Sequence, residues 1–588
     1  MIKLFAKSPG RPYPRTYPMF AFVTLPTASG APRARISLAT ALLALAHPLS
    51  AAESYADWAA SRFADLPSTS AATTADPDAD SLPNLLEYAL GTDPRSSTAP
   101  GTALSYQPPA ATGIYQFELL QRSGRQPSTQ LDFELSADLV TWLRPWSHRI
   151  AAASLPTDPV GSVRETFTTR LPARGTWFAR ASVTALDTAV ANANYYVAPT
   201  GSDTATGTRL DPFATIKKAA ELAQPGQLVY IRGGTYLSTD KISLTRAGTA
   251  ALPIRIRAYP GEKPVLDVSA TAGTSLDAIS ISGSYYHIYG LEIIGAAHNT
   301  VKISGNNNTI ENCVSRAARN TGFHITGGTA GTTYPANNLY LNCDSIRSFD
   351  APIGGNADGF SAKWNLGPGN TFRGCRAIEN SDDGWDLWMG DGSVLIENCW
   401  AVRSGINVWA SATFNGNGQG FKLGGNNVGA PHRLVRSLAW GNKAYGIDQN
   451  NNPTGLTVDH NVCWNNASGA INLNHVGVTL VGNHTVRDNV AIAGTGRSTV
   501  SIGGTAPVVQ NNSWQLFTGA NTVTLAEFLD TDGDAWMSAP RRDDGGLPDS
   551  PFMRPLPTSR LVNAGIATPG DTIYGPAPDL GAHETPTW

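Results

Sequence analysis

The sequence predicts an all-β protein whose largest part is a parallel β-helix, a solenoid of short strands. Its 588 residues are 41% apolar and only 15% charged, with 58 glycines and many Asn-Gly and Gly-Gly steps. This composition is typical of strands joined by turns. The second observation is an internal repeat of 24 to 39 residues that runs to about residue 510. A repeat of that length with short strands indicates a solenoid.

The bulk properties exclude several classes of protein. The formal net charge is −3, so the chain lacks the basic surface of a nucleic-acid-binding protein. Five cysteines in so long a chain are too few for a disulfide scaffold. We expect a monomer without a nucleic-acid partner.

Residues 1–52 are expected to be a signal peptide. Arg33 and Arg35 precede an apolar run at 36–46, and small residues follow at 50–52. This is the order of charge, apolar core and cleavage site in an export signal. The run is shorter than the roughly 20 residues that span a bilayer. A buried helix is the alternative. Export predicts a secreted or extracellular protein, or a periplasmic one, without a membrane segment after cleavage.

Residues 53–97 are predicted to form a small acidic module with a calcium loop. Positions 1, 3, 5, 9 and 12 of one run carry oxygen ligands at the spacing of an EF-hand. These residues are Asp76, Asp78, Asp80, Asn84 and Glu87. Ser81 stands where the EF-hand has glycine. The run resembles the calcium-binding repeats of secreted bacterial proteins, which implies a structural calcium ion. A solvated acidic loop before a helix at 85–90 is the alternative.

Residues 98–186 carry short runs in which apolar and polar residues alternate, at 115–119, 131–135 and 176–180. Alternation with a period of two predicts half-buried antiparallel strands, and we expect a small β-sandwich without a catalytic role. The segment is similar to accessory modules of secreted bacterial enzymes. Residues 185–194 are expected to be a linker.

Residues 194–588 are predicted to form the solenoid domain. It opens with an amphipathic helix at 211–223, which Pro225 and Gly226 end, and with strands at 228–231 and 254–256. Asparagines at the corners of the later repeat suit a left-handed backbone.

The cysteines mark the repeat. They lie 30, 32, 24 and 64 residues apart, and Leu438 fills the cysteine position of a further copy inside the longest gap. Stacking of the copies predicts one interior row of packing thiols, with a disulfide ladder as the alternative. The row would contain Cys313, Cys343, Cys375, Cys399 and Cys463. Each copy continues to a glycine followed by an apolar residue, at Gly322, Gly359, Gly384, Gly420, Gly446 and Gly469.

Aligning the copies on these glycines brings acids together. Asp358 and Asp383 directly precede the glycine on two successive coils, and Asp382 adjoins the second. Asp386 follows that glycine by two residues, and Lys422 holds the equivalent position on the next coil. Equivalent residues on neighbouring coils lie roughly 4.8 Å apart. Four carboxylates so close repel one another, and a bound cation would relieve the repulsion. Ligands that are all oxygen atoms favour calcium. A solvated acidic corner is the alternative.

The residues around these acids resemble a known family. Segments 356–360, 380–387 and 418–425 are similar to the active-site motifs of pectate lyases of polysaccharide lyase family 9. Segments 195–203 and 233–236 resemble the N-terminal cap of such enzymes, and 561–565 and 578–582 resemble a C-terminal segment common among them. The resemblance implies a right-handed β-helix and calcium-dependent cleavage of polygalacturonate, an acidic polysaccharide, by β-elimination. It implies Asp358, Asp382, Asp383 and Asp386 as ligands of catalytic calcium and Lys422 as the base.

Rival functions remain open at this point. A lyase of the same fold could act on rhamnogalacturonan or alginate. A polygalacturonase-type hydrolase also needs paired carboxylates, but the Gly-His-Gly and Arg-x-Lys motifs of that class are absent. A β-helix adhesin or sugar-binding module would not need a lysine beside the acids. Lys363, Trp364, Asn426 and Arg403 are candidates for holding neighbouring sugars, or are scaffold.

Overall fold

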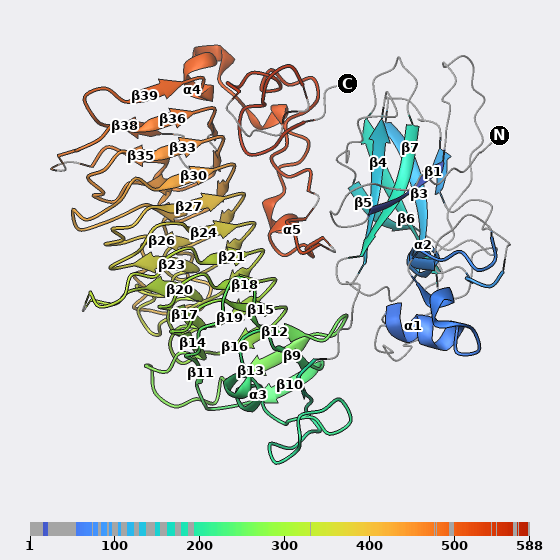
Figure 1. Cartoon of the computed structure of the whole chain (residues 1–588). Coiled ribbons are helices and arrows are strands. Elements are labelled where there is room, and N and C mark those ends of the chain that lie inside the picture. The colour runs from blue at the N-terminus through green and yellow to red at the C-terminus, as the bar shows by residue number, and fades with distance from the viewer. Residues whose placement is uncertain are drawn as a thin grey trace, which may run out of the picture. The chain divides into compact units, whose positions relative to one another are not determined.

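The computed structural model describes two units of the chain (Figure 1). Described are residues 16–21, 55–72, 74–79, 84–90 and 93–96, the strands between 104 and 185, and 193–585 except 330, 476, 478, 493–498, 543, 549, 568–572 and 574. One unit comprises Met1–Ala191 with Pro260–Glu262 and Trp588, and the other comprises Asn192–Tyr259 with Lys263–Thr587. Among the described residues, no helix combines the length and hydropathy of a membrane span.

The N-terminal unit contains short helices and two antiparallel sheets. Trp58, Phe63 and Tyr88 form a small buried core between the helices. The helices are α1 (Tyr55–Arg62), η1 (Ser68–Ala71) and α2 (Asn84–Leu90). The sheets have the orders β2-β3-β6-β5 and β1-β7-β4. Their strands are β1 (Thr16–Ala21), β2 (Leu104–Gln107), β3 (Ile114–Arg122), β4 (Thr129–Ser136), β5 (His148–Ala152), β6 (Ser162–Arg170) and β7 (Phe178–Ala185).

For two of the sequence predictions, only some of the residues concerned are described in this unit. Strand β1 pairs with β7 and lies inside the predicted signal peptide, whose charged and apolar parts at 33–52 are outside the described residues. Of the predicted calcium loop, Asp80 is likewise outside them. Asn84 and Glu87 are buried on α2. The Nδ2 atom of Asn84 donates to the carbonyl oxygens of Ser70 and Ala72, 2.7 and 2.9 Å away.

The second unit is a solenoid of three parallel sheets, as the repeat predicts (Figure 1). The first sheet has twelve strands: β8 (Tyr195–Val197), β9 (Leu228–Ile231), β12 (Ile254–Ala258), β15 (Tyr286–Tyr289), β18 (Thr309–Glu311), β21 (Leu339–Leu341), β24 (Asn370–Arg373), β27 (Val394–Glu397), β30 (Arg433–Val435), β33 (Thr457–Asp459), β36 (Thr485–Arg487) and β39 (Val508–Gln510). The second sheet has ten: β10 (Gly234–Leu237), β13 (Pro264–Asp267), β16 (Glu292–Ile294), β19 (Val314–Arg316), β22 (Asp344–Ile346), β25 (Arg376–Ile378), β28 (Trp400–Val402), β31 (Leu438–Trp440), β34 (Val462–Trp464) and β37 (Val490–Ile492).

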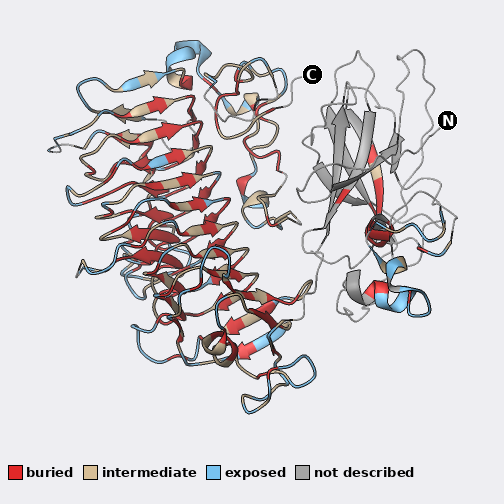
Figure 2. Cartoon of the chain, in the orientation of Figure 1, coloured by how far each residue is buried: buried red, intermediate tan, exposed pale blue. Residues whose placement is uncertain are grey.

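The third sheet carries the residues of the predicted site. Its ten strands are β11 (Ile242–Leu244), β14 (Ile279–Ile281), β17 (Val301–Ile303), β20 (Phe323–Thr326), β23 (Phe360–Lys363), β26 (Trp385–Asp386), β29 (Phe421–Lys422), β32 (Tyr445–Asp448), β35 (Gly469–Leu473) and β38 (Val500–Ile502). One continuous apolar core fills the space between the three sheets, so that most of the solenoid's strands are buried (Figure 2).

Helix α3 (Ile216–Leu222) closes the N-terminal end of the solenoid. It begins later than the predicted 211–223 because Asp203 holds the preceding turn in a non-helical form. Its carboxylate accepts hydrogen bonds from the backbone of Ala214 and Thr215. Thr215 then caps the helix by accepting from the backbone of Lys218 at 3.1 Å. Ile216, Ala219 and Ala220 are the residues that the helix buries.

The row of cysteines is shorter than predicted. Four cysteines stack directly before successive strands of the second sheet. On the next coil Leu438 pairs with Trp400, the residue after Cys399, so Ser437 and not Leu438 takes the cysteine position. The row continues as an asparagine ladder in which the Oδ1 atoms of Asn461, Asn489 and Asn512 each accept from the backbone of the coil before. Cys463 lies two residues further on, opposite Ala439. All five thiols are free and buried, which excludes the disulfide ladder.

The corners have the predicted left-handed backbone. Asparagines with positive φ recur at them: Asn312, Asn342, Asn398, Asn465 and Asn511. The glycine alignment holds through Gly446 but slips at the last copy, where Gly469 pairs with Tyr445.

The C-terminal segment packs on the outer face of the second sheet. Its short helices are α4 (Ser513–Leu516), η2 (Gly519–Asn521), η3 (Leu525–Glu527) and α5 (Gly533–Met537). Phe552 and Leu580 of this segment join Trp440 and Val490 of the sheet in a second buried core. Arg541 pairs with Asp344 at 2.6 Å. The segment therefore gives the outward face of the sheet an apolar partner.

Candidate active site

The third sheet fixes the register of the predicted acids and the lysine. Trp385 pairs with Phe360 and with Phe421, so Asp386 lies between Ser361 and Lys422. The three aromatic rings stack inside the solenoid with centroids 4.7 and 4.9 Å apart. Successive side chains of a strand alternate between faces, so this interior stack directs the residue after each ring outward. The alignment read from the sequence is confirmed at these coils.

Three of the four predicted aspartates converge. Single carboxylate oxygens of Asp358, Asp383 and Asp386 lie within 4.8 Å of one another, and all three residues are buried. The Nζ atom of Lys422 lies 3.0 Å from Asp383 Oδ2 and 3.4 Å from Asp386 Oδ2. The predicted base therefore contacts two of the predicted ligands.

Asp382 is buried beside this group, in contact with a neighbouring loop. Its Oδ1 atom accepts a hydrogen bond from the backbone of Asn417 at 2.6 Å, and Asp383 Oδ1 accepts from the backbone of Gln419 at 2.8 Å. Both donors belong to the long loop between β28 and β29. Phe349, Trp409 and Phe414 stabilise the loop as a cluster of near-parallel rings, with the Phe349 and Trp409 centroids 4.5 Å apart.

A second lysine belongs to the cluster. Lys363 Nζ bridges Asp358 Oδ2 at 2.9 Å and Asp386 Oδ2 at 2.5 Å. The sequence predicted Lys363 as a sugar contact or a scaffold residue and did not place it among the four aspartates. Its position at the end of β23, five residues after Asp358, could have indicated this contact. Four carboxylates and two ammonium groups leave a formal charge of −2, which one divalent cation would balance.

Burial and the charges of the cluster shift the pKa values of its residues. Burial raises the pKa of Asp358 to about 7, with the charges of Asp386 and Asp383 adding to the effect and Lys363 opposing it. Burial and the neighbouring aspartates likewise raise the pKa values of Asp382 and Asp383. Burial lowers the pKa of Lys422, but the surrounding aspartates outweigh it and hold the pKa above its ordinary value. Such strongly perturbed pKa values in one cluster are typical of functional sites.

These residues suit a hard divalent cation. Calcium takes six to eight oxygen ligands, with carboxylates prominent among them, and carboxylate oxygens are the acceptors that converge here. Burial and the neighbouring aspartates both disfavour the ionised carboxylates, and a bound cation would favour them.

The other predicted sugar contacts separate in space. Trp364 lies edge-on to Trp388, with ring centroids 5.6 Å apart. The backbone of Trp388 donates a hydrogen bond to Asp386, and the next residue, Met389, contacts Asn426 Nδ2 through its Sδ atom. Trp364 and Asn426 therefore lie near the Asp386 end of the acid cluster. Arg403 instead pairs with Glu379 and with Asp534 of the C-terminal segment. Arg403 therefore belongs to the scaffold.

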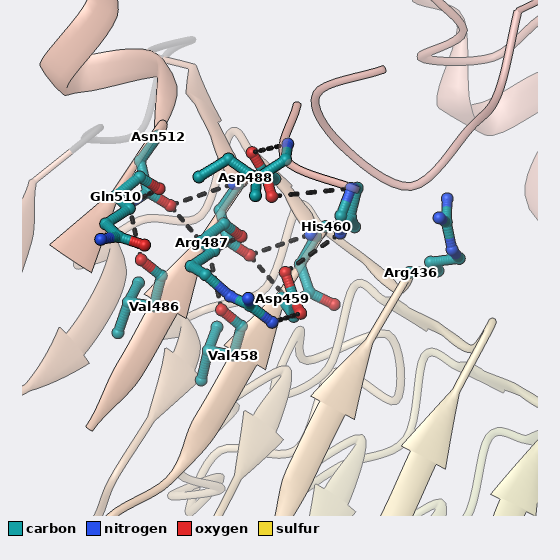
Figure 3. Close-up of polar contacts among 12 residues, drawn as sticks. Arg436, Val458, Asp459, His460, Val486, Arg487, Asp488, Gln510 and Asn512 are labelled. Carbon is teal, nitrogen blue, oxygen red and sulfur yellow. Dashed lines mark hydrogen bonds and ion pairs between the residues drawn. The ribbon is translucent and has the colours of Figure 1, made fainter. Parts of the chain in front are cut away.

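A second acidic group, Asp459, His460 and Asp488, lies where strands β33 and β36 of the first sheet end (Figure 3). Asp459 Oδ1 lies 3.0 Å from His460 Nδ1, and its Oδ2 pairs with Arg487 at 2.7 Å. Asp488 Oδ1 accepts from the backbone of Ile566 at 3.1 Å. Asp459 is thus paired twice, and Asp488 links the end of the first sheet's strands to the C-terminal segment.

Comparison with known proteins places the chain in a family. A family model described as the Pel9A-like, right handed beta helix region matches residues 195–510. The chain belongs to this family of pectate lyases. It is 36% identical over 401 residues to pectate lyase L of Dickeya chrysanthemi, covering 66% of this chain and 90% of that one. It is 31% identical to pectate lyase PEL9 of Emericella nidulans, covering 63% and 94%.

Two solved structures also match the solenoid of this chain. The crystal structure of pectate lyase Pel9A matches with a TM-score of 0.59 and 33% identity, covering 66% of this chain and 96% of that chain. A rhamnogalacturonan lyase matches with a TM-score of 0.53 and 27% identity, covering 62% and 96%.

Proposed function

We propose that the chain is a secreted, calcium-dependent pectate lyase that cleaves 1,4-linked polygalacturonate by β-elimination, with Lys422 as the base. The observation that carries the proposal is the contact of Lys422 with Asp383 and Asp386 inside a buried group of four aspartates. Family membership adds the chemistry, because its relatives include pectate lyases from bacteria and a fungus.

We infer that Asp358, Asp382, Asp383 and Asp386 hold calcium. An oxygen-only donor set favours calcium over the softer transition metals, and the formal charge of −2 favours a divalent ion. When bound, calcium would neutralise the C6 carboxylate of a uronate residue and increase the acidity of the adjacent C5–H.

Lys422 is proposed to remove the C5 proton. In its neutral form the Nζ lone pair accepts that proton and a C4–C5 double bond forms as the C4–O4 bond breaks. The bond's electron pair leaves with O4, which takes a proton from solvent, so no water is added to the products. Asp383 and Asp386 orient the amine. Lysine acts as a base only when neutral, so the raised pKa of Lys422 in the cation-free protein implies that calcium and substrate must offset the aspartate charges.

A substrate panel tests the proposal. Polygalacturonate should yield unsaturated, ultraviolet-absorbing ends with calcium, and none after chelation. Rhamnogalacturonan and alginate serve as comparison substrates, because one structural relative is a rhamnogalacturonan lyase. A faster reaction with either of them would reassign the substrate, and cleavage without unsaturated ends would contradict elimination.

We further propose accessory roles for the N-terminal region. Residues 1–52 direct export, the Asp76 to Glu87 loop holds a structural calcium ion, and the mature protein is a monomer. Asn84 supports the loop assignment, because its Oδ1 atom is buried without a hydrogen-bond partner among the described residues. Calcium titration of Asp78→Ala should lose one site while turnover persists. Loss of turnover would contradict a purely structural role.

A further inference from the structure

The outward face of the third sheet continues past Lys422 toward the last coils. The register places Lys422 beside Asp448, Asp448 beside Asn472, and Asn472 beside Ser501. Neighbouring strands lie about 4.8 Å apart, so Asn472 is about two strand spacings from Lys422. A polymer that lies along the solenoid axis over Lys422 therefore meets these residues next.

The charge of Asp448 is compensated within the protein. Asp448 is buried, and its Oδ1 atom accepts from Asn472 Nδ2 at 2.9 Å and lies 3.4 Å from His475 Nε2. The contact with Asp448 raises the pKa of His475, which favours the imidazolium. When His475 is protonated, this stretch of the face therefore presents no uncompensated negative charge to a polyanion.

A pocket of about 440 Å³ opens beside His475. Beside the apolar Leu480 and Val481, its described lining carries amides, hydroxyls and one imidazole, and no carboxylate. These polar groups come from Gln449, Asn474, His475, Thr479, Asn483 and Thr505. Asn474 is held by a hydrogen bond from its Nδ2 atom to Ser501 Oγ at 3.2 Å. Convergent amides and hydroxyls in a concave site are suited to fixing the orientation of a polar ligand such as a sugar.

The two ring nitrogens of His475 have different surroundings. Nε2 faces Asp448, and no described residue accepts a hydrogen bond from Nδ1. About a third of the His475 side chain, 30%, is exposed. The imidazolium thus keeps one donor for a ligand, and charge-assisted hydrogen bonds to carboxylates are the strong ones.

We infer that this pocket is a distal subsite that binds one uronate residue of the polymer, with His475 contacting its carboxylate. The inference rests on the proposed function and extends it. The subsite lies on one side of Lys422 only, so it favours chains long enough to reach from the acid cluster to the last coils.

Binding to a catalytically inactive protein tests the subsite. In a full-length Lys422→Ala parent, calorimetric titration with oligogalacturonates of increasing length should show a gain in affinity once the chain reaches the pocket. Adding His475→Gln should weaken binding of the long oligomers about tenfold, the scale of one charge-assisted hydrogen bond, and leave short ones unchanged. His475→Lys, which keeps the positive charge, should retain most of the gain.

The matched control is His287→Gln in the same parent. His287 also pairs with an acid, Glu311, at 2.8 Å, but lies on the first sheet. It should leave the affinity for every oligomer unchanged. Equal affinity of the parent and the His475→Gln protein for long oligomers would overturn the subsite alone. A parent that binds no oligogalacturonate would contradict the proposed function as well.

Discussion

At the scale of single residues, the aspartates around Lys422 work against its role as a base. Free lysine titrates near about 10.4, and Asp383 and Asp386 hold the pKa of Lys422 above its ordinary value in the cation-free protein. Turnover should therefore rise from neutral pH into the alkaline range. Lys422→Ala should lose several powers of ten in kcat yet still bind calcium, and Lys422→Arg should be similarly poor because arginine stays protonated. Steady-state kinetics measure both.

The control for this experiment is Lys217→Ala, which removes a surface lysine paired with Glu221. It should keep wild-type kcat. Near-normal elimination by Lys422→Ala would assign the base elsewhere, and Lys363, which touches Asp358 and Asp386, would be tested next.

Asp358 links the cation site to stability. Burial raises its pKa to about 7, above the unfolded value, so the folded, cation-free protein binds more protons than the unfolded chain between about pH 4 and 7. Its stability should therefore fall as pH rises through that window. Bound calcium would stabilise the ionised carboxylate of Asp358 and so offset this loss of stability. Calcium should therefore raise the melting temperature more at pH 8 than at pH 5.

Thermal scans with and without a chelator measure this effect, and Asp358→Asn should flatten the pH dependence of the chelated protein. A calcium-induced shift of equal size at both pH values would contradict the linkage.

Individual site residues were predictable where the repeat fixed their register. Asp358, Asp383, Asp386 and Lys422 follow from glycines that stack in successive coils. Lys363 was not placed in the cluster, because a strand-end lysine can point to solvent or turn back to an acid, and only packing decides. Cys463 was misplaced because a cysteine two residues out of register has the same local sequence context.

At the scale of structural elements, the asparagine ladder stabilises the C-terminal coils. Asn489 is fully buried, donates to Val458 O and Asn512 Oδ1 at 2.9 Å, and accepts from the backbone of Asn461. Asn489→Ala leaves several of these groups unpaired, which should cost about 3 kcal/mol. Urea unfolding measures the loss. The control, Asn521→Ala on an exposed turn, should change stability by less than about 0.5 kcal/mol.

A urea midpoint for Asn489→Ala equal to that of Asn521→Ala would show that the ladder does not support the solenoid.

The corner asparagines were predictable from their tolerance of positive φ. The ladder itself was not, because its hydrogen bonds join coils that are 23 to 28 residues apart. The same holds for the loop whose Asn417 and Gln419 backbones bind Asp382 and Asp383.

At the scale of the whole molecule, the solenoid has its own cap, core and C-terminal cover. Helix α3 closes one end, and the segment after residue 512 covers the second sheet. A protein that begins near Asn194 should therefore fold and keep full activity on short, soluble oligogalacturonates. Circular dichroism and product assays measure this. Aggregation or lost activity would show that the N-terminal unit completes the fold.

Sequence periodicity predicted the solenoid but not its C-terminal cover. Phe552 and Leu580 contact Trp440 and Val490 through a segment without a repeat, so no pattern in the sequence indicates which sheet it covers. Long-range packing of irregular segments depends on side-chain shape, which periodicity does not encode.

The fate of the solvent oxygen tests the central claim most directly. A defined oligogalacturonate is cleaved in water labelled with heavy oxygen, and the products are weighed by mass spectrometry. Elimination by Lys422 breaks the C4–O4 bond without water, so the account predicts unsaturated products whose summed mass equals that of the substrate and which carry no label. Products that gain the mass of one water molecule and carry the label would show hydrolysis and contradict the account.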